Sequence, residues 1–453
     1  MSKERAVGGN PSDDLDRRRT EAHERYRAAR PRSEAIHREA LEVLPGGNTR
    51  SVLHFEPFPF RVASAHDQVL VDVDGHRYID LCGNYTAGLL GHSPTRIKEA
   101  VVDVLDGGWA IGATHPREVE LAELICDRFP SIDQVRFTNS GTEANLMAIG
   151  TALHHVAHHG GQTDHGATER TTIGVFDHGY HGGVLAFGDL DGPHNPMNVP
   201  HRFRVGPFDD VAALDDLFQP DLACVLVEAV QGSGGCRPAS PAFLHELRRR
   251  CDETGTVLIF DEVMTSRLGP GGAQQRFDVL PDMTTLGKYL AGGMTFGAFG
   301  GRRHIMAAFD PERPDALTQA GTFNNNIVSM TAAITTLRHE LDADTLGEVN
   351  DRGDRLRQEL QTTFEQAGAP LWVTGLGSML CVHGDDDRLV DLYFHAMLDQ
   401  GLYLARRGFM ALSKAVTDDD CARLVAATRT WLADPAGFPA GGPAPDPASG
   451  GGP

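Results

Sequence analysis

The sequence predicts an α/β protein in which a large domain with a mostly parallel sheet is accompanied by a smaller α+β domain. Between about residues 70 and 330, short apolar runs alternate with helical stretches such as Pro241–Thr254, which is typical of strands joined by helical crossovers. After Asn326 the pattern changes to a long helix, then a few strands and then helices again, which indicates the second domain. The 453 residues are enough for both.

Changes of composition set the expected domain boundaries. Both ends are predicted to be disordered, because the first residues are polar and charged and the last ones, from Pro435, are rich in proline and glycine. The segment before the large domain has helical spacing up to Pro45-Gly46-Gly47 and is expected to join the small domain. We expect the N-terminal tail at residues 1–20 and the joining segment at 21–75. The large domain is expected at 76–330, the rest of the small domain at 331–434 and the C-terminal tail at 435–453.

Short apolar runs mark the candidate strands. In the large domain they are Val135–Thr138, Thr172–Phe176, Ala223–Val227, Val257–Phe260 and Met283–Leu286. In the small domain they are Leu371–Thr374 and Ser378–Val382. Ligands of parallel sheets gather beyond the carboxyl ends of the strands, so the polar motifs that follow these runs are the candidate site.

Charge and hydropathy narrow the classes of partner. The formal net charge is −21, whereas nucleic-acid binding needs a basic surface, so nucleic acid is not expected. No apolar run approaches the roughly 20 residues that span a bilayer, and the N-terminus lacks the apolar stretch of a secretory signal. The seven cysteines are dispersed without metal-binding spacing, which is typical of reduced thiols. We therefore expect a cytoplasmic protein without a membrane partner.

Lysine is rare in this chain, which makes each one informative. Lys3, Lys98, Lys288 and Lys414 are the four present. Lys288 follows the apolar run Met283–Leu286 and precedes a glycine-rich turn, so its amine is expected at a strand end among small and apolar residues. That setting favours a neutral, nucleophilic amine. Elimination among four lysines leaves two alternatives open at this point, a reactive amine and an isolated surface lysine.

Two polar motifs follow other strand ends. Asp261 and Glu262 come after Val257–Phe260, where a carboxylate can either pair with a protonated ring nitrogen or cap a helix. The run Thr138–Asn145 lies between a strand and a helix, where hydroxyls and free N–H groups suit a phosphate. The same run is also a good capping box. The residues alone leave both alternatives open for each motif.

Three weaker features complete the candidates. The ring of Tyr180 can stack on a flat cofactor or belong to the core, and Glu228 ends a strand and can orient polar groups around such a ring. The histidine-rich stretch at 154–170 is of a kind that can bind metal. Its neighbours are typical of a loop, however, and no carboxylate or cysteine stands at ligand spacing, so no metal site is expected.

Together these motifs resemble those of the class III aminotransferases, enzymes of pyridoxal 5′-phosphate (PLP) fold type I, the aspartate-aminotransferase-like fold. The resemblance covers roughly residues 40–430. It is carried by NSGTEAN, GYHGG, VLVEAVQG, LIFDEVMTSR, TLGKYLAGG and GTFNNN, at residues 139–145, 179–183, 225–232, 258–267, 285–293 and 321–326. It implies PLP as the cofactor and a homodimer whose sites are shared between subunits.

The resemblance also implies a role for each motif residue. Lys288 would hold the cofactor's aldehyde and move the proton, and Asp261 would bind the ring nitrogen, with Glu228 near the ring. Ser140, Gly141 and Thr142 would contact the phosphate. Tyr180 and Val263 would contact the two faces of the ring. Thr322 would contact the phosphate of the neighbouring subunit.

Two subgroups of the family compete, the β-amino-acid aminotransferases of the β-phenylalanine type and the glutamate-1-semialdehyde 2,1-aminomutases. Residues 45–60 and 403–413 resemble the carboxylate-binding segments of the former. This implies Arg50, Tyr85 and Arg407 as substrate-binding residues, with Arg406 as an alternative to Arg407. The expected reaction transfers the amino group of an aromatic β-amino acid to a 2-oxo acid, 2-oxoglutarate or pyruvate. The alternative is the aminomutase reaction, which moves an amine within one molecule.

Overall fold

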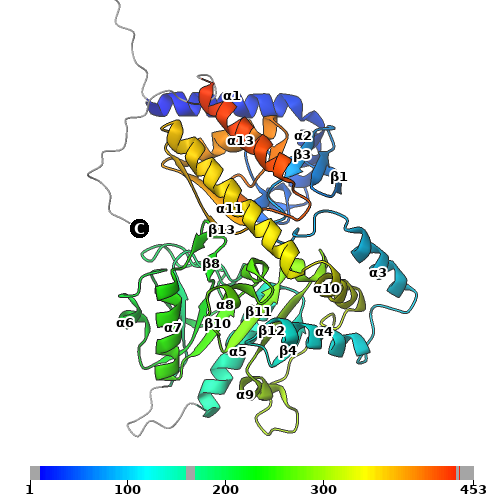
Figure 1. Ribbon diagram of the computed structural model, residues 1–453, viewed down its shortest axis with the longest axis vertical. Coiled ribbons are helices and arrows are strands. Elements are labelled where there is room, and N and C mark those ends of the chain that lie inside the picture. The colour runs from blue at the N-terminus through cyan, green and yellow to red at the C-terminus, as the bar shows by residue number, and fades with distance from the viewer. Residues whose placement is uncertain (1–10, 160–168, 435–437, 439–453) are drawn as a thin grey trace, which may run out of the picture. The chain divides into compact units, whose positions relative to one another are not determined.

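The computed structural model describes residues 11–159, 169–434 and 438. It divides into two compact units (Figure 1). The large unit comprises residues 86–351 and 375–379, and the small unit comprises 1–85, 352–374 and 380–453. Each unit is built from segments that are separate in the sequence. The sequence led us to expect this for the small domain.

A seven-stranded sheet forms the centre of the large unit, in the order β4-β12-β11-β10-β7-β5-β6. All neighbouring strands are parallel except at β12, which runs antiparallel to both β11 and β4. The strands are β4 Gln134–Thr138, β5 Thr172–Phe176, β6 Arg202–Gly206, β7 Leu222–Val227, β10 Val257–Asp261, β11 Met283–Gly287 and β12 Gly297–Gly301, and β8 Val230–Gln231 pairs separately with β9 Arg237–Pro238. The five predicted strands and the mostly parallel sheet are confirmed.

Helices cover this sheet, which explains why its central strands are buried along their whole length. α5 lies across five of the strands, and its buried side joins theirs in one core (Figure 1). The helices are α3 Thr95–Leu105, α4 Pro116–Arg128, α5 Gly141–His159, α6 Leu214–Leu217, α7 Pro241–Thr254, α8 Gly272–Arg276, α9 Arg303–Met306 and α10 Ile327–His339, with 3₁₀ turns η3 Thr265–Leu268, η4 Lys288–Ala291 and η5 Ala307–Phe309. α7 has the predicted bounds because Ser240 caps its start and Gly255, at φ 63°, ends it.

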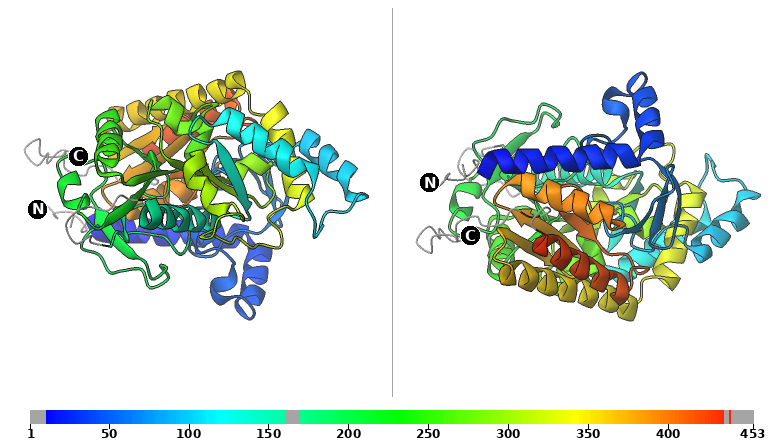
Figure 2. Two further views of the ribbon diagram at one scale, coloured as in Figure 1. Left: turned by 90° about the horizontal axis from the view of Figure 1, so that it is seen from below. Right: turned by 90° about the horizontal axis from the view of Figure 1, so that it is seen from above.

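The small unit has the predicted α+β character. One sheet has the order β1-β2-β3-β15 and another has the order β13-β14-β16. Its elements are α1 Pro11–Ala29, α2 Pro31–Leu41, η1 Pro45–Gly47, η2 Ser51–Leu53, β1 Val62–His66, β2 Val69–Asp72, β3 Arg77–Asp80, β13 Leu371–Leu376, β14 Met379–Gly384, α12 Asp387–Asp399, β15 Leu402–Tyr403, β16 Phe409–Ala411 and α13 Asp418–Ala433, while α11 Ala343–Gln366 begins in the large unit. α1 packs along α12 (Figure 2).

The expected N-terminal tail is wrong for residues 11–20, which form the first half of α1. Charges that suggested disorder are paired along the helix, because Arg17 lies one turn from both Asp14 and Glu21. Arg19 also bonds to the buried Asp391, 2.9 Å away. Residues 1–10 and, apart from Phe438, the expected C-terminal tail lie outside the described residues.

The domain boundaries differ from those expected. α10 and the chain up to residue 351 belong to the large unit, because α10 packs on α3 and α4. Residues 76–85 belong to the small unit, because β3 pairs with both β2 and β15. The sequence pattern predicts where a helix begins. The elements against which the helix packs determine the unit to which it belongs.

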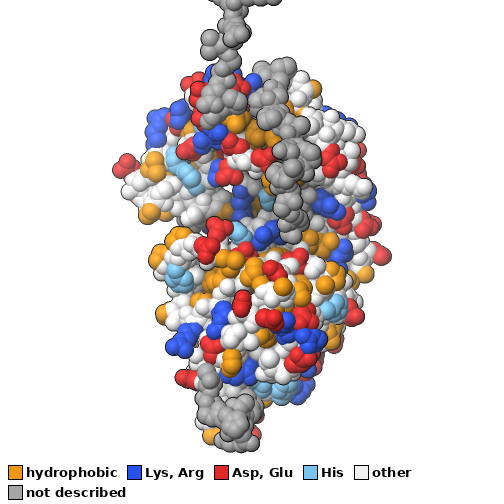
Figure 3. All heavy atoms as spheres, turned by 90° about the vertical axis from the view of Figure 1, so that its left-hand side faces the viewer, with side chains coloured by type: hydrophobic (Ala, Val, Ile, Leu, Met, Phe, Trp, Pro, Cys, Tyr) orange, Lys and Arg blue, Asp and Glu red, His pale blue; other side chains and the backbone are white. Residues whose placement is uncertain are grey.

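The surface of the described residues carries mixed charges. On the face shown in Figure 3, acidic side chains are interspersed with basic and apolar ones. Within the described ranges, no helix combines the length and the apolar character needed to cross a bilayer.

Candidate active site

The loop between β4 and α5 is the expected phosphate site. The Asn139 N–H donates to Glu143 Oε2 at 2.7 Å, and the Glu143 N–H donates to Ser140 Oγ at 3.2 Å. The motif is therefore a capping arrangement, the second of the two alternatives that the sequence left open. The first turn of any helix still has further N–H groups that its own backbone cannot satisfy, so the cap and an anion site are compatible.

Two glycines allow neighbouring segments to close on this loop. A Cβ at Gly141 would lie 2.7 Å from both methyl groups of Val263, and a Cβ at Gly182 would lie 2.1 Å from Thr142 Oγ1. Gly182 also has φ +125°, which other residues rarely adopt. Any larger residue would displace Val263 or Thr142, so glycine at both positions lets these neighbouring segments pack closely against the loop.

Asp261 ends β10 at the centre of a buried hydrogen-bond network. Its Oδ2 lies 2.8 Å from Asn145 Nδ2 and 2.8 Å from His181 Nδ1, and its Oδ1 accepts from the Val263 N–H at 3.0 Å. Thr285 Oγ1 in turn donates to Asn145 Oδ1 at 2.6 Å. Four elements of the large unit thus hold one carboxylate in a defined orientation.

The charge of this carboxylate is also determined by its neighbours. Burial raises the pKa of Asp261, but the hydrogen bond and charge of His181, the Val263 N–H and the charge of Lys288 lower it below its usual range. Asp261 is therefore ionised at neutral pH and suited to a protonated ring nitrogen. The contribution of Lys288 shows that the amine and the carboxylate belong to one electrostatic cluster.

Lys288 is the first residue of η4, directly after β11. It has φ +53°, an uncommon conformation for a residue with a side chain, and such strain is concentrated at functional sites. Its side chain is half-buried, next to the fully buried Tyr289. The strand-end position that the sequence predicted is confirmed.

The adjacent carboxylates Asp261 and Glu262 have different functions. Glu262 accepts from the N–H groups of Ala273 and Gln274 at 2.6 and 3.0 Å, so it holds the start of α8. Burial raises the pKa of Glu262 to about 7. Of the two acids that the sequence offered, Asp261 is the candidate ring-nitrogen ligand and Glu262 is a helix cap.

Glu228 positions the loop that carries Tyr180. Its two oxygens accept from the Tyr180 N–H at 3.0 Å and from the Gly232 N–H at 3.1 Å. Burial raises the pKa of Glu228 to about 7, with His181 and Asp261 acting in opposite directions. The Tyr180 side chain is 41% exposed, so it is not the core tyrosine that the sequence left as an alternative.

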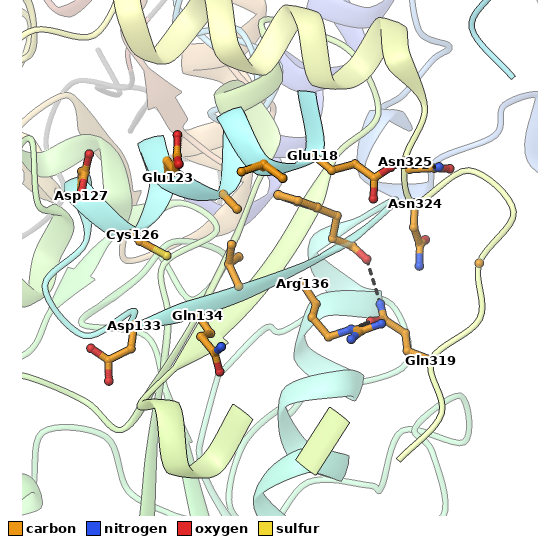
Figure 4. Close-up of a pocket in the computed structure, with 15 residues that line it drawn as sticks. Glu118, Glu123, Cys126, Asp127, Asp133, Gln134, Arg136, Gln319, Asn324 and Asn325 are labelled. Carbon is orange, nitrogen blue, oxygen red and sulfur yellow. Dashed lines mark hydrogen bonds between the residues drawn. The ribbon is translucent and has the colours of Figure 1, made fainter. Parts of the chain in front are cut away.

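Thr322 lies in an exposed loop before α10, and this loop is tied to the phosphate loop of its own chain. Asn324 Oδ1 accepts from Asn139 Nδ2 at 2.9 Å, and Gln319 Nε2 donates to the Phe137 carbonyl at 2.8 Å. A cavity of about 720 Å³ lies between this loop, β4 and α4. Figure 4 shows Arg136 and Gln319 bordering it.

The sequence did not single out His181, Asn145 or Thr285. All three stand inside motifs that it did single out, at GYHGG, NSGTEAN and TLGKYLAGG. The sequence offered one indication of their role. A polar residue inside a motif at a strand end must form a hydrogen bond if it is buried. Only the folded structure shows that all three are buried and that Asp261 joins them.

A separate cluster in the small unit brings together the predicted substrate residues. The guanidinium carbons of Arg50 and Arg407 lie 5.5 and 5.9 Å from the centre of the Tyr85 ring. Arg50 also donates to Asn84 Oδ1 at 2.7 Å. Arg406 instead lies 3.5 Å from Asp391. The two neighbouring arginines therefore have different contacts, and Arg407 is the one that lies beside Tyr85.

The histidine-rich stretch was expected to be a loop, and this is wrong for residues 154–159, which continue α5. The apolar residues between the histidines explain the difference, because Val156 is buried against the core of the large unit. Residues 160–168 lie outside the described part of the chain.

Comparison with known proteins adds the family context. The family model described as aminotransferase class-III matches residues 53–429. The chain is 42% identical over 434 residues to a β-phenylalanine transaminase from Variovorax paradoxus, covering 92% of this chain and 96% of that protein. The crystal structure of a β-phenylalanine aminotransferase from that organism matches with a TM-score of 0.87 and 41% identity, covering 92% of this chain and 97% of that one.

Two further relatives extend the comparison. A solved transaminase with PLP bound has a TM-score of 0.80 and 32% identity, covering 89% of this chain and 97% of that one. A glutamate-1-semialdehyde 2,1-aminomutase from Heliobacterium modesticaldum is 34% identical over 429 residues, covering 87% of this chain and 95% of that protein. The similarity in every case extends over nearly the whole chain.

Proposed function

The chain belongs to the class-III aminotransferase family, and we propose that it transfers the amino group of an aromatic β-amino acid to a 2-oxo acid. The observation that carries the proposal is the 42% identity to a β-phenylalanine transaminase over nearly the full length of both proteins. The aminomutase is the more distant of the two curated relatives, at 34%. The two arginines beside Tyr85 add a matching chemical feature, a cationic site for carboxylates.

The cofactor of this family is PLP, and the residues of the large unit fit it. Lys288 would hold its aldehyde, Asp261 its ring nitrogen, and Ser140, Gly141 and Thr142 its phosphate. Tyr180 and Val263 would cover the ring faces, and Glu228 would position the Tyr180 loop. When bound, PLP supplies an electron sink for the charge that develops on the amine-bearing carbon of the substrate.

Lys288 has two tasks in this proposal. Its amine would hold the aldehyde of bound PLP, and the same amine would serve as the base that accepts the proton from the amine-bearing carbon of the substrate. Asp261 stays ionised throughout, because His181 and the Val263 N–H lower its pKa. A fixed negative charge there keeps a proton on the ring nitrogen and so favours charge withdrawal into the ring.

The arginines beside Tyr85 would bind the carboxylates. A planar guanidinium can hold a carboxylate through two parallel hydrogen bonds, and both the amino donor and the oxo-acid acceptor carry one. Arg50 and Arg407 are exposed and therefore accessible to small anions. One site can thus serve both halves of a ping-pong reaction.

A homodimer follows from the family resemblance, and one face of the large unit supports it. Val119 and Phe323 are large apolar side chains that are more than half exposed near the cavity of Figure 4. Burial of such groups favours association. The family resemblance implies that Thr322, which adjoins Phe323, would then reach the phosphate bound by the second copy. Sedimentation of the purified protein should give twice the mass of the chain, and a monomer would exclude shared sites.

The cytoplasm is the proposed location. No disulfide joins the seven cysteines, all of which lie within the described residues, and six of them are buried. Free thiols are typical of a reducing compartment. Fractionation of cells that express the tagged chain should recover it with other cytoplasmic enzymes, and recovery with secreted proteins would contradict the proposal.

A half-reaction tests the proposed activity. Racemic β-phenylalanine is added to PLP-loaded protein without an acceptor, and the absorbance of the bound cofactor is followed. We expect a spectral change that 2-oxoglutarate or pyruvate reverses. No change with β-phenylalanine but turnover of glutamate-1-semialdehyde without any added oxo acid would instead establish the aminomutase reaction.

A further inference from the structure

The C-terminal end of α5 carries a group of side chains that the aminotransferase reaction does not use. His154 and His158 lie one helical turn apart, with ring centres 4.1 Å apart. Asp315, from the segment after η5, places its Oδ2 3.6 Å from His154 Nε2. The three side chains offer ligand atoms that all lie within 4.8 Å of one another.

The backbone that carries these side chains is firmly packed. Ala152 and Val156, on the buried side of the same helical turns, share a core with Ile305 and Met306 of α9. The two histidines therefore project from a fixed helix. Small rotations of side chains, without any change of backbone, are enough to bring the three ligand atoms closer together.

The hydrogen bonds around the group leave suitable ligand atoms. His158 Nδ1 lies 2.8 Å from the carbonyl oxygen of His154, so it is the nitrogen that carries the proton and Nε2 keeps a lone pair. Asp315 also pairs with Arg313, at 3.1 and 3.2 Å.

We propose that His154, His158 and Asp315 form a binding site for a divalent transition-metal cation, with Zn²⁺ as the best match. Two histidines at positions i and i+4 of a helix present their rings on one face, which is a recurrent zinc-binding spacing. Imidazole nitrogens select zinc, nickel or copper over the hard cations Mg²⁺ and Ca²⁺. A cation is also favoured near the C-terminal end of a helix by its dipole.

A metal at this place has a structural role. It joins the end of α5 to the segment after η5, which the sequence separates by about 155 residues. The site lies roughly 20 Å along α5 from Gly141, at 1.5 Å for each residue. It is therefore remote from the phosphate loop at the other end of the helix, and its expected effect is on stability. Sequence spacing did not reveal it because Asp315 is supplied by another part of the chain.

Thermal unfolding of the PLP-loaded enzyme tests the proposal. The protein is freed of metal with a chelator, desalted, and measured with increasing ZnCl₂ or with equal concentrations of MgCl₂. We expect zinc to raise the unfolding midpoint by roughly 2–5 °C and the effect to saturate at one equivalent for each chain. Magnesium should leave the midpoint unchanged. Equal effects of the two cations, or no effect of zinc, would leave only a His154–Asp315 ion pair and overturn the proposal.

Matched variants assign the effect to these residues. His158→Ala and Asp315→Asn change side chains that are at least partly exposed, so both variants should fold and both should lose the zinc shift. His304→Ala is the control, because His304 lies at the same corner, 5.3 Å from the ring of His155, but outside the group. It should keep the shift. A zinc shift that survives in both test variants would place the metal elsewhere and overturn the proposal.

Discussion

The network around Asp261 in the large unit and the arginine pair beside Tyr85 in the small unit present charged side chains in opposite settings. Around Asp261, the side chains of Asn145, His181 and Thr285 are all buried. Asn145 and His181 form hydrogen bonds with Asp261, and Thr285 donates to Asn145. Arg50 and Arg407 are exposed. Arg50 donates one hydrogen bond to the side-chain oxygen of Asn84 and lies over the face of the Tyr85 ring.

This difference corresponds to what each region must bind. The cofactor is the same in every turnover, so a rigid and fully bonded network can be matched to it once. The substrates alternate between an amine donor and an oxo acid, so the groups that hold them must accommodate two shapes. Long side chains at the surface can do so, at the cost of weaker, salt-screened interactions.

The largest effect is expected from Lys288→Ala. Loss of the amine removes both the attachment of the cofactor and the base, so turnover should fall by about 10⁴-fold or more. Asp261 and the phosphate loop remain, so the variant should still bind PLP, as measured by equilibrium dialysis. Lys98→Ala, an exposed lysine on α3, is the control and should keep full activity. Substantial turnover by the Lys288 variant would refute the assignment.

The next effect is expected from Asp261→Asn. An amide cannot balance a protonated ring nitrogen, so kcat should fall by roughly 10²–10³-fold in both half-reactions, measured by single-turnover absorbance. The fold should persist, because Asn is nearly isosteric with Asp. A loss confined to KM would mean that Asp261 only binds and does not assist the chemistry.

His181 provides a finer test of the same network. It lowers the pKa of Asp261, so His181→Leu should raise that pKa. As the pH is lowered, the activity of the variant should therefore begin to fall at a higher pH than that of the unmodified enzyme. His181→Gln keeps an N–H donor and should restore part of the shift. An unchanged pH profile in the leucine variant would show that His181 has a packing role alone.

These two regions also differ in how far the sequence could predict them. Lys288, Asp261 and the phosphate loop occupy short motifs at strand ends, where local pattern and topology together determine position. His181 and Asn145 stood inside the same motifs, yet their role depends on burial and on contact with a third segment. The group of His154, His158 and Asp315 could not be predicted, because Asp315 is distant in sequence from the two histidines. The domain boundary near residue 331 was misplaced because α10 owes its place to packing on α3 and α4.

In the arginine pair, Arg407→Ala is expected to act on binding more than on chemistry. A charged hydrogen bond to a carboxylate is worth about 1.5–3 kcal/mol, so KM for the donor and the acceptor should rise roughly 10–100-fold with a smaller change in kcat. Arg406→Ala is the matched control, since Arg406 lies beside Asp391 and not Tyr85. Equal rises of KM in the two variants would contradict the distinction between these neighbours.

The smallest effect is expected at Asn84, which is exposed and bonded to Arg50 through a neutral amide. Asn84→Asp would place a negative charge there and compete with the substrate carboxylate for the same guanidinium. At the surface such a pair is worth about 1 kcal/mol or less, so KM should rise by roughly five-fold at most, and less at high ionic strength. Asp tolerates the φ of +46° at this position as Asn does. Asn84→Gly, which removes the amide without adding charge, separates the two causes. If both variants raise KM equally at all salt concentrations, the amide only positions Arg50. A rise specific to the aspartate at low salt would show that a neutral residue here keeps the full charge of Arg50 available to the substrate.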